Sequence, residues 1–447
     1  MSTPSQFIAE QKVVGIMIKP DNEMIFSNGL HQNALNLYYT INQIAGYTPL
    51  LVACDSHLPV ENRNIETPYM MVGDIPVRPL SIFYKTYQLH ALLLVSVSPD
   101  PKDCRRIQQT GTKIVATSYG HKFAMAMEAM AFGNYYKEVY EGTGTPTKKK
   151  ASGGFTRYHN NTIDKVWYSP HFIWTKQYLA HLYSLPLQDV SACPYIWSPK
   201  PIESIMKDWS ATRPDFNPYY YRGDPKNKSF YSTEPNINVL KTTLIPFGIV
   251  EEILKNSPGI FDEYYMFGGQ KLSENSHFLE RLKYSVASGG PQTPGYNTPK
   301  IQFEHRRHMS YIYSRAKVQL AHHWDCGLNY TLLEAAHYHH PIVHNSEFMK
   351  DLGYYYKGAN VYDAVVLAER ALRHEERDDL LEYNKRCDMV VERFLYNNQE
   401  NVQGYKSLLD NLFDRRVSVV LPDYIRELEE ATTYGDAYLI PQGNVKI

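Results

Sequence analysis

The stretch that decides the fold is VQLAHHWDCGLNYTLLEAAHYHHPIVHN, from Val318 to Asn345. Its start, VQLAHH, has the length and apolar character of a buried strand, and WDCGLN after it is polar and turn-prone. Asn329 is a good N-cap for YTLLEAAHYHH, a segment of helical composition that cannot continue through Pro341. IVHN then predicts another strand. The order strand, loop, helix, strand predicts one βαβ unit of a parallel sheet.

The loop and helix of this unit predict a nucleotide site. Ligands of open α/β sheets bind beside the carboxyl ends of the strands, where N–H groups at a helix N-terminus favour anions. Glu334 stands in the first turns of the predicted helix. A carboxylate at that place can accept two hydrogen bonds from a ribose diol. We therefore expect Glu334 to bind the ribose of a nucleotide.

The chain opens with the same alternation of strand and helix. VVGIMIK (13–19) predicts a buried strand, and a helical period of apolar residues follows it. Asn28 and Gly29 stand in the loop between them, where a glycine lets the backbone approach a phosphate or a sugar. Another strand is predicted at 113–121 and ends in His121. This histidine serves either a substrate or the packing of the strand end.

Several stretches together carry a resemblance to a known family. They are FSNGLHQNAL (26–35), PYIWSP (194–199), EPNINVLKTTLIPFGIVEEI (234–253), HHWDCGLNYTLLEA (322–335) and PIVHNSEFMKDLGYYY (341–356). In this order, over about residues 13–370, the chain resembles the DUF2827 family of phages and Gram-negative bacteria. The last two stretches also resemble the C-terminal half of GT-B glycosyltransferases. Asp325 departs from the GT-B signature, because it stands one residue farther from Glu334 than the usual first acidic residue.

The resemblance implies an α/β GT-B fold, in which two Rossmann-like domains face each other across a cleft. A chain of 447 residues is also longer than one hydrophobic core usually serves. The predicted parts are an acceptor domain at 1–199 with a mobile basic insertion at about 140–160, a linker at 200–233, a donor domain at 234–422, and a tail at 423–447 that packs back on the first domain.

The resemblance also implies roles for the site residues, with a UDP-sugar as co-substrate and no bound cofactor. Lys241 supplies a positive charge to the donor diphosphate from the first turns of a helix that Asn238 or Asn236 caps. His31 or His121 acts as a general base. The predicted donor-binding residues are Glu334, Asn329, Tyr330, Leu328, Asp325, His323, Glu234, Asn236, Asn28 and Gly29.

Two acceptors remain open within this activity. One is a hydroxylated pyrimidine base of phage DNA, which receives arabinose or glucose; the other is a bacterial surface polysaccharide. The basic insertion is either a solvated loop or a contact to the DNA backbone, where each neutralised phosphate adds salt-dependent affinity. Arg306 and Arg307 would add to this positive rim. The predicted acceptor-binding residues are Lys148, Lys149, Lys150, Arg157 and His171. A hypothesis of another class is a nucleotide- or DNA-binding module without turnover.

Metal chemistry is not expected. The chain contains no DxD motif, the commonest metal anchor of single-domain glycosyltransferases, which favours a metal-independent transferase. His337, His339, His340 and His344 form a cluster in the sequence. They lack a matching cysteine or carboxylate partner, so the cluster does not predict a zinc site.

The composition of the chain bears on nucleic-acid binding, on the cellular compartment and on membrane insertion. The net charge of −1 argues against a strongly basic surface for nucleic acid, although a local patch is compatible with that average. The five cysteines form no CxxC pair, which fits reduced thiols in a cytosol. The first residues lack a signal-peptide pattern, and the longest apolar run, ALLLVSV (91–97), is too short to span a bilayer. We therefore expect a cytoplasmic protein with no membrane span.

Overall fold

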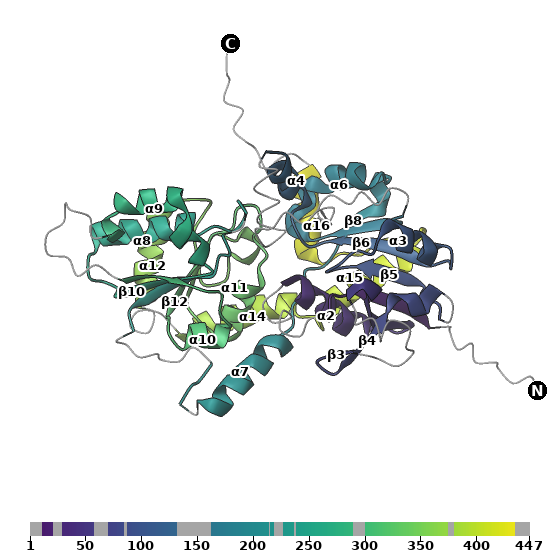
Figure 1. The fold of residues 1–447 in the computed structure, drawn as a ribbon, viewed down its shortest axis with the longest axis horizontal. Helices are drawn as coiled ribbons and strands as arrows, with labels where there is room; N and C mark the ends of the chain where they lie inside the picture. Colours follow the sequence, from purple (N-terminus) through teal and green to yellow (C-terminus); the bar gives the residue numbers. More distant parts are fainter. Residues whose placement is uncertain are drawn as a thin grey trace, which may run out of the picture. The chain divides into compact units, whose positions relative to one another are not determined.

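A computed structural model divides the chain into two compact units. Unit 1 comprises Met1–Ser198 and Phe394–Ile447, and unit 2 comprises Pro199–Arg393 (Figure 1). The structure describes residues 11–20, 29–57, 70–84, 87–131, 162–213, 215–218, 227–236, 238–288, 300–373 and 380–433.

The described strands of unit 1 form one sheet in the order β3-β4-β2-β1-β5-β6-β7-β8. Only the β3–β4 pair among them is antiparallel. The strands are β1 (Lys12–Met17), β2 (Tyr47–Ala53), β3 (Met70–Val72), β4 (Ile75–Pro79), β5 (Ala91–Leu94), β6 (Lys113–Ser118), β7 (Lys165–Tyr168) and β8 (Val190–Ala192). The helices are α2 (Gly29–Ile41), α3 (Pro101–Gln108), α4 (Lys122–Ala131), α6 (Lys176–Tyr183), α15 (Gln399–Phe413) and α16 (Asp423–Thr433).

The core of unit 1 includes side chains from both ends of the chain. The strands are nearly continuous apolar runs, as expected for a parallel sheet that is covered on both faces. Helix α15 adds Val402, Tyr405, Leu408, Leu409 and Leu412 to the same buried cluster as β1 and α2. In Figure 1 this yellow-green helix runs with the purple α2 beside the sheet of unit 1. Helix α15 is therefore part of the core of unit 1.

Unit 2 contains a parallel sheet in the order β11-β10-β9-β12-β13-β14. Its strands are β9 (Ser229–Ser232), β10 (Glu263–Phe267), β11 (Lys300–Glu304), β12 (Val318–Leu320), β13 (Ile342–His344) and β14 (Tyr354–Tyr355). Its helices are α7 (Lys200–Thr212), α8 (Leu244–Asn256), α9 (Ser276–Lys283), α10 (Met309–Tyr313), α11 (Tyr330–His337), α12 (Val361–Leu372) and α14 (Leu380–Phe394), whose last residue belongs to unit 1.

The strand order of unit 2 reverses between β9 and β12. From β9 the chain continues outward through β10 and β11, and from β12 it continues outward on the other side through β13 and β14. Such a reversal is the topological switch point, where the loops after the two central strands diverge and leave a place for a ligand. The loops after β9 and β12 are therefore the first place to search for a site in unit 2.

These observations confirm the predicted α/β class with two Rossmann-like parts. The predicted βαβ unit is present as β12, α11 and β13, and Asn329 is the N-cap of α11. Helix α11 ends at His337 rather than near Pro341, because His339 turns the backbone to a φ of 57°.

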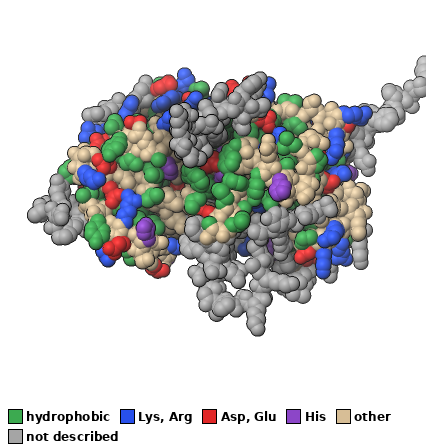
Figure 2. All heavy atoms as spheres, turned by 90° about the horizontal axis from the view of Figure 1, so that it is seen from above, with side chains coloured by type: hydrophobic (Ala, Val, Ile, Leu, Met, Phe, Trp, Pro, Cys, Tyr) green, Lys and Arg blue, Asp and Glu red, His purple; other side chains and the backbone are tan. Residues whose placement is uncertain are grey.

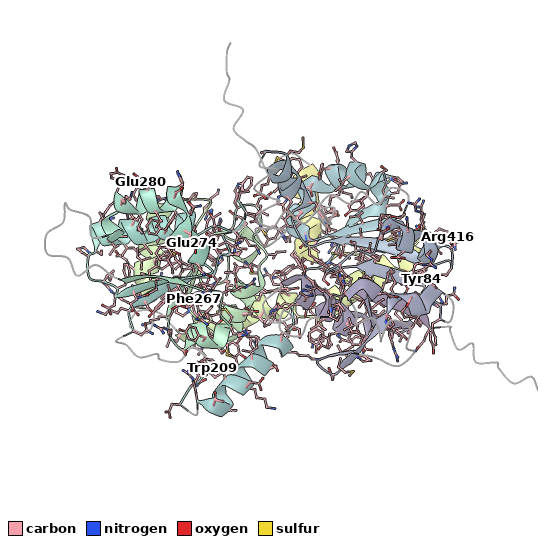
Figure 3. All side chains as sticks on the ribbon, in the orientation of Figure 1. Tyr84, Trp209, Phe267, Glu274, Glu280 and Arg416 are labelled. Carbon is pink, nitrogen blue, oxygen red and sulfur yellow. The ribbon has the colours of Figure 1, made fainter. Side chains whose placement is uncertain are left out.

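The division of the chain differs from the predicted boundaries in two places. The predicted linker at 200–233 contains α7 and β9, the strand at the centre of the second sheet. In Figure 3, Trp209 projects from α7; its ring lies edge-on to that of Tyr311 at 6.2 Å. The predicted donor domain ends at Arg393 instead of residue 422, because α15 contributes its apolar face to the core of unit 1.

One face of the described surface carries mixed charge. On the face drawn in Figure 2, blue and red side chains are interspersed among apolar and uncharged ones. None of the described helices combines the length and the apolar character that crossing a bilayer requires.

Candidate functional site

Two loops of unit 2 meet at the switch point between β9 and β12. The backbone N–H of Trp324, after β12, donates to the carbonyl of Leu240, after β9, at 3.1 Å. The side chains of Glu234 and His323 also meet there, with 3.2 Å between the Glu234 carboxylate and His323 Nε2. Both side chains are buried. Glu234 and His323, which the sequence predicts as donor-binding residues, are therefore neighbours.

Asn329 connects this pair to the start of α11. Its Oδ1 accepts from the N–H of Thr331 at 3.2 Å, which is the N-cap bond. Its Nδ2 lies 2.7 Å from His323 Nε2. The backbone of His323 is fixed in turn by Asn345, whose Oδ1 accepts from the His323 N–H at 2.9 Å and whose Nδ2 donates to the His323 carbonyl at 3.1 Å.

The loop between β12 and α11 has little freedom to rearrange. Asp325 adopts a φ of 47°, in the left-handed region. A side chain at Gly327 would meet the ring of Phe348 at 3.0 Å and Ser346 Oγ at 3.2 Å. Ser346 Oγ also donates to the Gly327 carbonyl at 2.7 Å. This packing fixes the direction in which α11 begins. The next predicted donor-binding residues, Leu328 and Tyr330, have buried side chains, so only their backbone groups suit the predicted role.

Lys241 lies in the loop before α8, so its predicted place in the first turns of a helix is wrong. Helix α8 begins at Leu244 because Pro246 is tolerated only in a first turn. Asn238 pairs with Lys241 across the turn instead of capping the helix. Asn236 does serve the helix start, since its Oδ1 accepts from the Thr243 N–H at 2.7 Å, with Asn236 itself at a φ of 52°.

The charge of Lys241 acts on the loop that precedes α11. Burial raises the pKa of the Cys326 thiol, and the positive charge of Lys241 opposes this increase. Glu234 and Asp325 act on the same thiol in the opposite direction. The charges of one ammonium and two carboxylates therefore all act on the Cys326 thiol.

Glu334 lies in α11 and is almost completely buried. Burial raises the pKa of the Tyr231 and Tyr313 hydroxyls, and the Glu334 carboxylate raises both further. Partial desolvation lowers the pKa of Arg306, an exposed residue, and the charge of Glu334 opposes this change. The sequence pattern instead predicts Arg306 on a DNA-facing rim. Its place directly after strand β11, at the carboxyl end, was the available signal.

The predicted site residues of unit 1 lie at or near the carboxyl edge of its own sheet, or outside the described residues. His121 is buried between β6 and α4; its Nδ1 accepts from the Ala124 N–H at 3.3 Å, and its ring lies 5.6 Å from that of Trp174. His171 is also buried, with Nδ1 2.9 Å from Ser169 Oγ. Both histidines therefore make local contacts at the ends of their own strands.

The first described helix of unit 1, α2, includes a residue that the sequence predicts in the preceding loop. Gly29 is the first residue of α2 rather than part of a loop, and His31 is buried in its first turn. Asn28 lies outside the described residues, as do Lys148, Lys149, Lys150 and Arg157.

The histidine cluster of the sequence is dispersed in the structure. His337 pairs with Glu203, His339 with Asp388, and His340 and His344 face the carbonyls of Pro218 and Leu352. Within the ranges that the structure describes, no group of three or more His, Cys, Asp or Glu side chains is arranged to hold a metal ion.

One family model matches most of the chain. The family model described as "Protein of unknown function (DUF2827)" matches residues 13–409. No curated protein matches the sequence.

Solved structures resemble the chain over most of its length. The α,α-trehalose-6-phosphate synthase of Burkholderia multivorans shares 11% identity at a TM-score of 0.49, with 92% of this chain and 99% of that chain covered. The Anabaena protein HepE in complex with UDP-glucose shares 10% identity at 0.47, covering 88% and 99%. Sucrose-phosphate synthase of Thermosynechococcus elongatus shares 12% identity at 0.44, covering 91% and 100%.

Proposed function

The chain belongs to the DUF2827 family. We propose that it is a glycosyltransferase and that unit 2 binds its UDP-sugar donor. One observation carries the proposal: the N-terminus of α11, the charge of Lys241 and the carboxylate of Glu334 belong to elements that flank one switch point. Diphosphate, ribose and base are the groups that such a place is suited to recognise.

In this proposal Lys241 and the N–H groups at the start of α11 hold the diphosphate, and Glu334 accepts from the ribose. A developing negative charge on the leaving UDP is stabilised by groups already in position, so the protein needs little rearrangement during reaction. A general base, His31 or His121, completes the chemistry, and no metal is needed. Arg306 is a further cation for the nucleotide, because it is exposed and the charge of Glu334 acts on its guanidinium.

For the acceptor we favour a hydroxylated pyrimidine base of phage DNA, with arabinose or glucose as the sugar. The family resemblance and the lysines at 148–150 support this choice. A surface polysaccharide is the second candidate, because the described surface in Figure 2 has interspersed charges and the whole chain has a net charge of −1.

The donor half of the proposal is tested by UDP binding and by UDP release from UDP-sugars. Lys241→Ala and Glu334→Ala should each weaken UDP binding by about 2 kcal/mol, roughly thirtyfold in Kd, because each removes a charge-assisted hydrogen bond. Matched controls are Lys283→Ala and Glu280→Ala, an exposed pair on α9 whose loss should leave UDP binding unchanged. Unaltered binding in both site variants would refute the assignment.

The acceptor half needs a separate measurement. Mass spectrometry of nucleosides from DNA that contains hydroxylated pyrimidines, after incubation with the enzyme and a panel of UDP-sugars, should detect a glycosylated base. Transfer to glycan but not to DNA would favour the polysaccharide candidate.

A further inference from the structure

Arginine side chains and aromatic rings alternate along one surface of unit 2. The guanidinium of Arg213 lies over the ring of Trp209, with its central carbon 4.3 Å from the ring centroid. The rings of Trp209, labelled in Figure 3, and Tyr311 form a T-shaped pair with centroids 6.2 Å apart. The guanidiniums of Arg307 and Arg315 lie over the Tyr311 ring at 5.2 and 5.7 Å. We call these five residues the arginine–aromatic row.

The spacing of the sequence produces this row. Arg307, Tyr311 and Arg315 follow one another at four-residue intervals around α10, and Trp209 and Arg213 have the same spacing at the end of α7. Such an interval puts side chains on one face of a helix. Each arginine is therefore held over a ring of its own segment, and the T-shaped ring pair joins the two segments.

The guanidiniums of the row are accessible and only partly neutralised. All three arginines are exposed, whereas both rings are half-buried. Arg307 lies 3.7 Å from the Glu304 carboxylate. Within the part of the chain that the structure describes, Arg213 and Arg315 form no ion pair. The row therefore presents more positive charge than its own carboxylate contact offsets.

A guanidinium held over a ring still has groups to offer a ligand. The ring contact uses one face of the planar group, while the N–H donors lie in its plane and suit the paired oxygens of a phosphate. Arg315 spends two of its five donors on the hydroxyls of Tyr311 and Tyr265, at 3.0 and 3.5 Å. Arg213 and Arg307 donate no side-chain hydrogen bond to any described residue. All three arginines thus retain donors.

This combination of groups fits an unpaired nucleic-acid strand. Phosphates accept from the in-plane donors, and bases stack on guanidinium planes and aromatic rings. A duplex offers the same phosphates but keeps its bases stacked inside. A sulfated polysaccharide offers anions but no planar base. Only the unpaired strand uses both the charge and the planar groups of the row.

We propose that the arginine–aromatic row is a docking surface for single-stranded DNA. The inference goes beyond the proposed function, because the row contains none of the residues assigned to the UDP-sugar. Apart from Arg307, which the sequence predicts on a basic rim, its members have no predicted role. An unpaired strand is also the form in which a base-modifying enzyme can reach its target.

Binding of a fluorescein-labelled oligothymidylate to the full-length protein, followed by fluorescence anisotropy over a series of NaCl concentrations, tests this surface. If the three arginines each contact a phosphate, the logarithm of the association constant should fall with the logarithm of the salt concentration with a slope of about −2. No donor sugar and no turnover are needed for this measurement.

Two kinds of variant separate a built surface from general attraction between charges. Arg213→Gln and Arg307→Gln should each weaken binding and reduce the size of the slope by about 0.7, because each loses one phosphate contact. Arg213→Lys keeps the charge and therefore the slope, but it loses the planar group, so the affinity should fall about tenfold. The matched control is Arg416→Gln, an exposed arginine of unit 1 with the same change of net charge, which should bind like the wild-type protein.

Several results would overturn the inference. They are absence of oligothymidylate binding by the wild-type protein, equal losses in Arg213→Gln and Arg416→Gln, unchanged affinity in Arg213→Lys, and binding of duplex DNA or heparin as tight as that of the single strand. UDP binding, measured on the same proteins, should be unchanged in Arg213→Gln. A wild-type protein that binds the oligonucleotide but not UDP would refute the proposed donor site and leave the docking surface standing.

Discussion

At the scale of single residues, two groups of buried charges among the described residues differ in their surroundings. The Glu234–His323 pair belongs to the candidate site and leaves polar atoms without partners. In unit 1, by contrast, buried Asp189 lies 3.3 Å from Lys165 Nζ and 2.8 Å from the Arg415 guanidinium. Lys165 also donates to Asn411 on α15. This second group has one carboxylate between two cations, although Asp189 Oδ1 accepts no hydrogen bond, and it joins β7 to the C-terminal segment.

We expect Asp189→Ala to decrease the free energy of unfolding by about 3 kcal/mol, since it leaves the buried Lys165 ammonium without its carboxylate. Urea denaturation followed by circular dichroism measures the change. Asp414→Ala is the matched control, because its partner Arg416, labelled in Figure 3, is fully exposed at the surface, and the pair should add little. Equal stability of Asp189→Ala and the wild-type protein would contradict a supporting role for this ion pair.

At the scale of elements, the sequence predicts the limits of a helix well where the apolar periodicity and the residues that start or stop a helix agree. Asn329 and Pro341 bracket α11, and both limits were predicted within a few residues. The start of α8 was misplaced because Asn236 and Asn238 looked like caps, although Pro246 restricts the start to the preceding turn. Strand β9, the four residues SFYS, was missed inside a Pro- and Tyr-rich stretch. Its burial depends on neighbouring strands that no local pattern reveals.

The attachment of α15 to β2 should depend on pH. Burial raises the pKa of Asp410, but hydrogen bonds from Lys406 and Tyr47 outweigh this effect, so the pKa lies below 3.8. A carboxyl whose pKa is lower in the folded state stabilises the protein above pH 4 and loses that contribution as the pH falls further. Between pH 5 and pH 3, we expect the urea midpoint to decrease more in the wild-type protein than in Asp410→Asn. Parallel pH profiles would contradict this contribution.

At the scale of the whole molecule, the sequence predicted two Rossmann-like parts but not the path of the chain between them. The amphipathic pattern of α15 predicts a helix with one apolar face, yet it does not indicate which core receives that face. The structure shows that it belongs to unit 1, through residues such as Tyr405 and Leu409. Likewise, the donor-site residues were predicted individually, but the strand order that brings Glu234 and His323 together is a property of the complete sheet.

It follows that residues 1–198 alone should not fold stably. Without α15 the fragment lacks five buried apolar side chains, each of which contributes about 1.5–3 kcal/mol, and their sum is comparable to the stability of a typical domain. Circular dichroism and thermal denaturation of this fragment should show no cooperative transition. Addition of residues 394–433 through a flexible linker should restore one. A cooperative transition in the fragment alone would contradict this account of unit 1.

The most direct test of the central claim is hydrogen–deuterium exchange of the intact protein with and without UDP. If the nucleotide binds at the switch point of unit 2, UDP should slow exchange in the loop after β9, residues 233–244, and in the loop and helix start after β12, residues 321–334. Slower exchange confined to other segments, with these two unchanged, would contradict the claim.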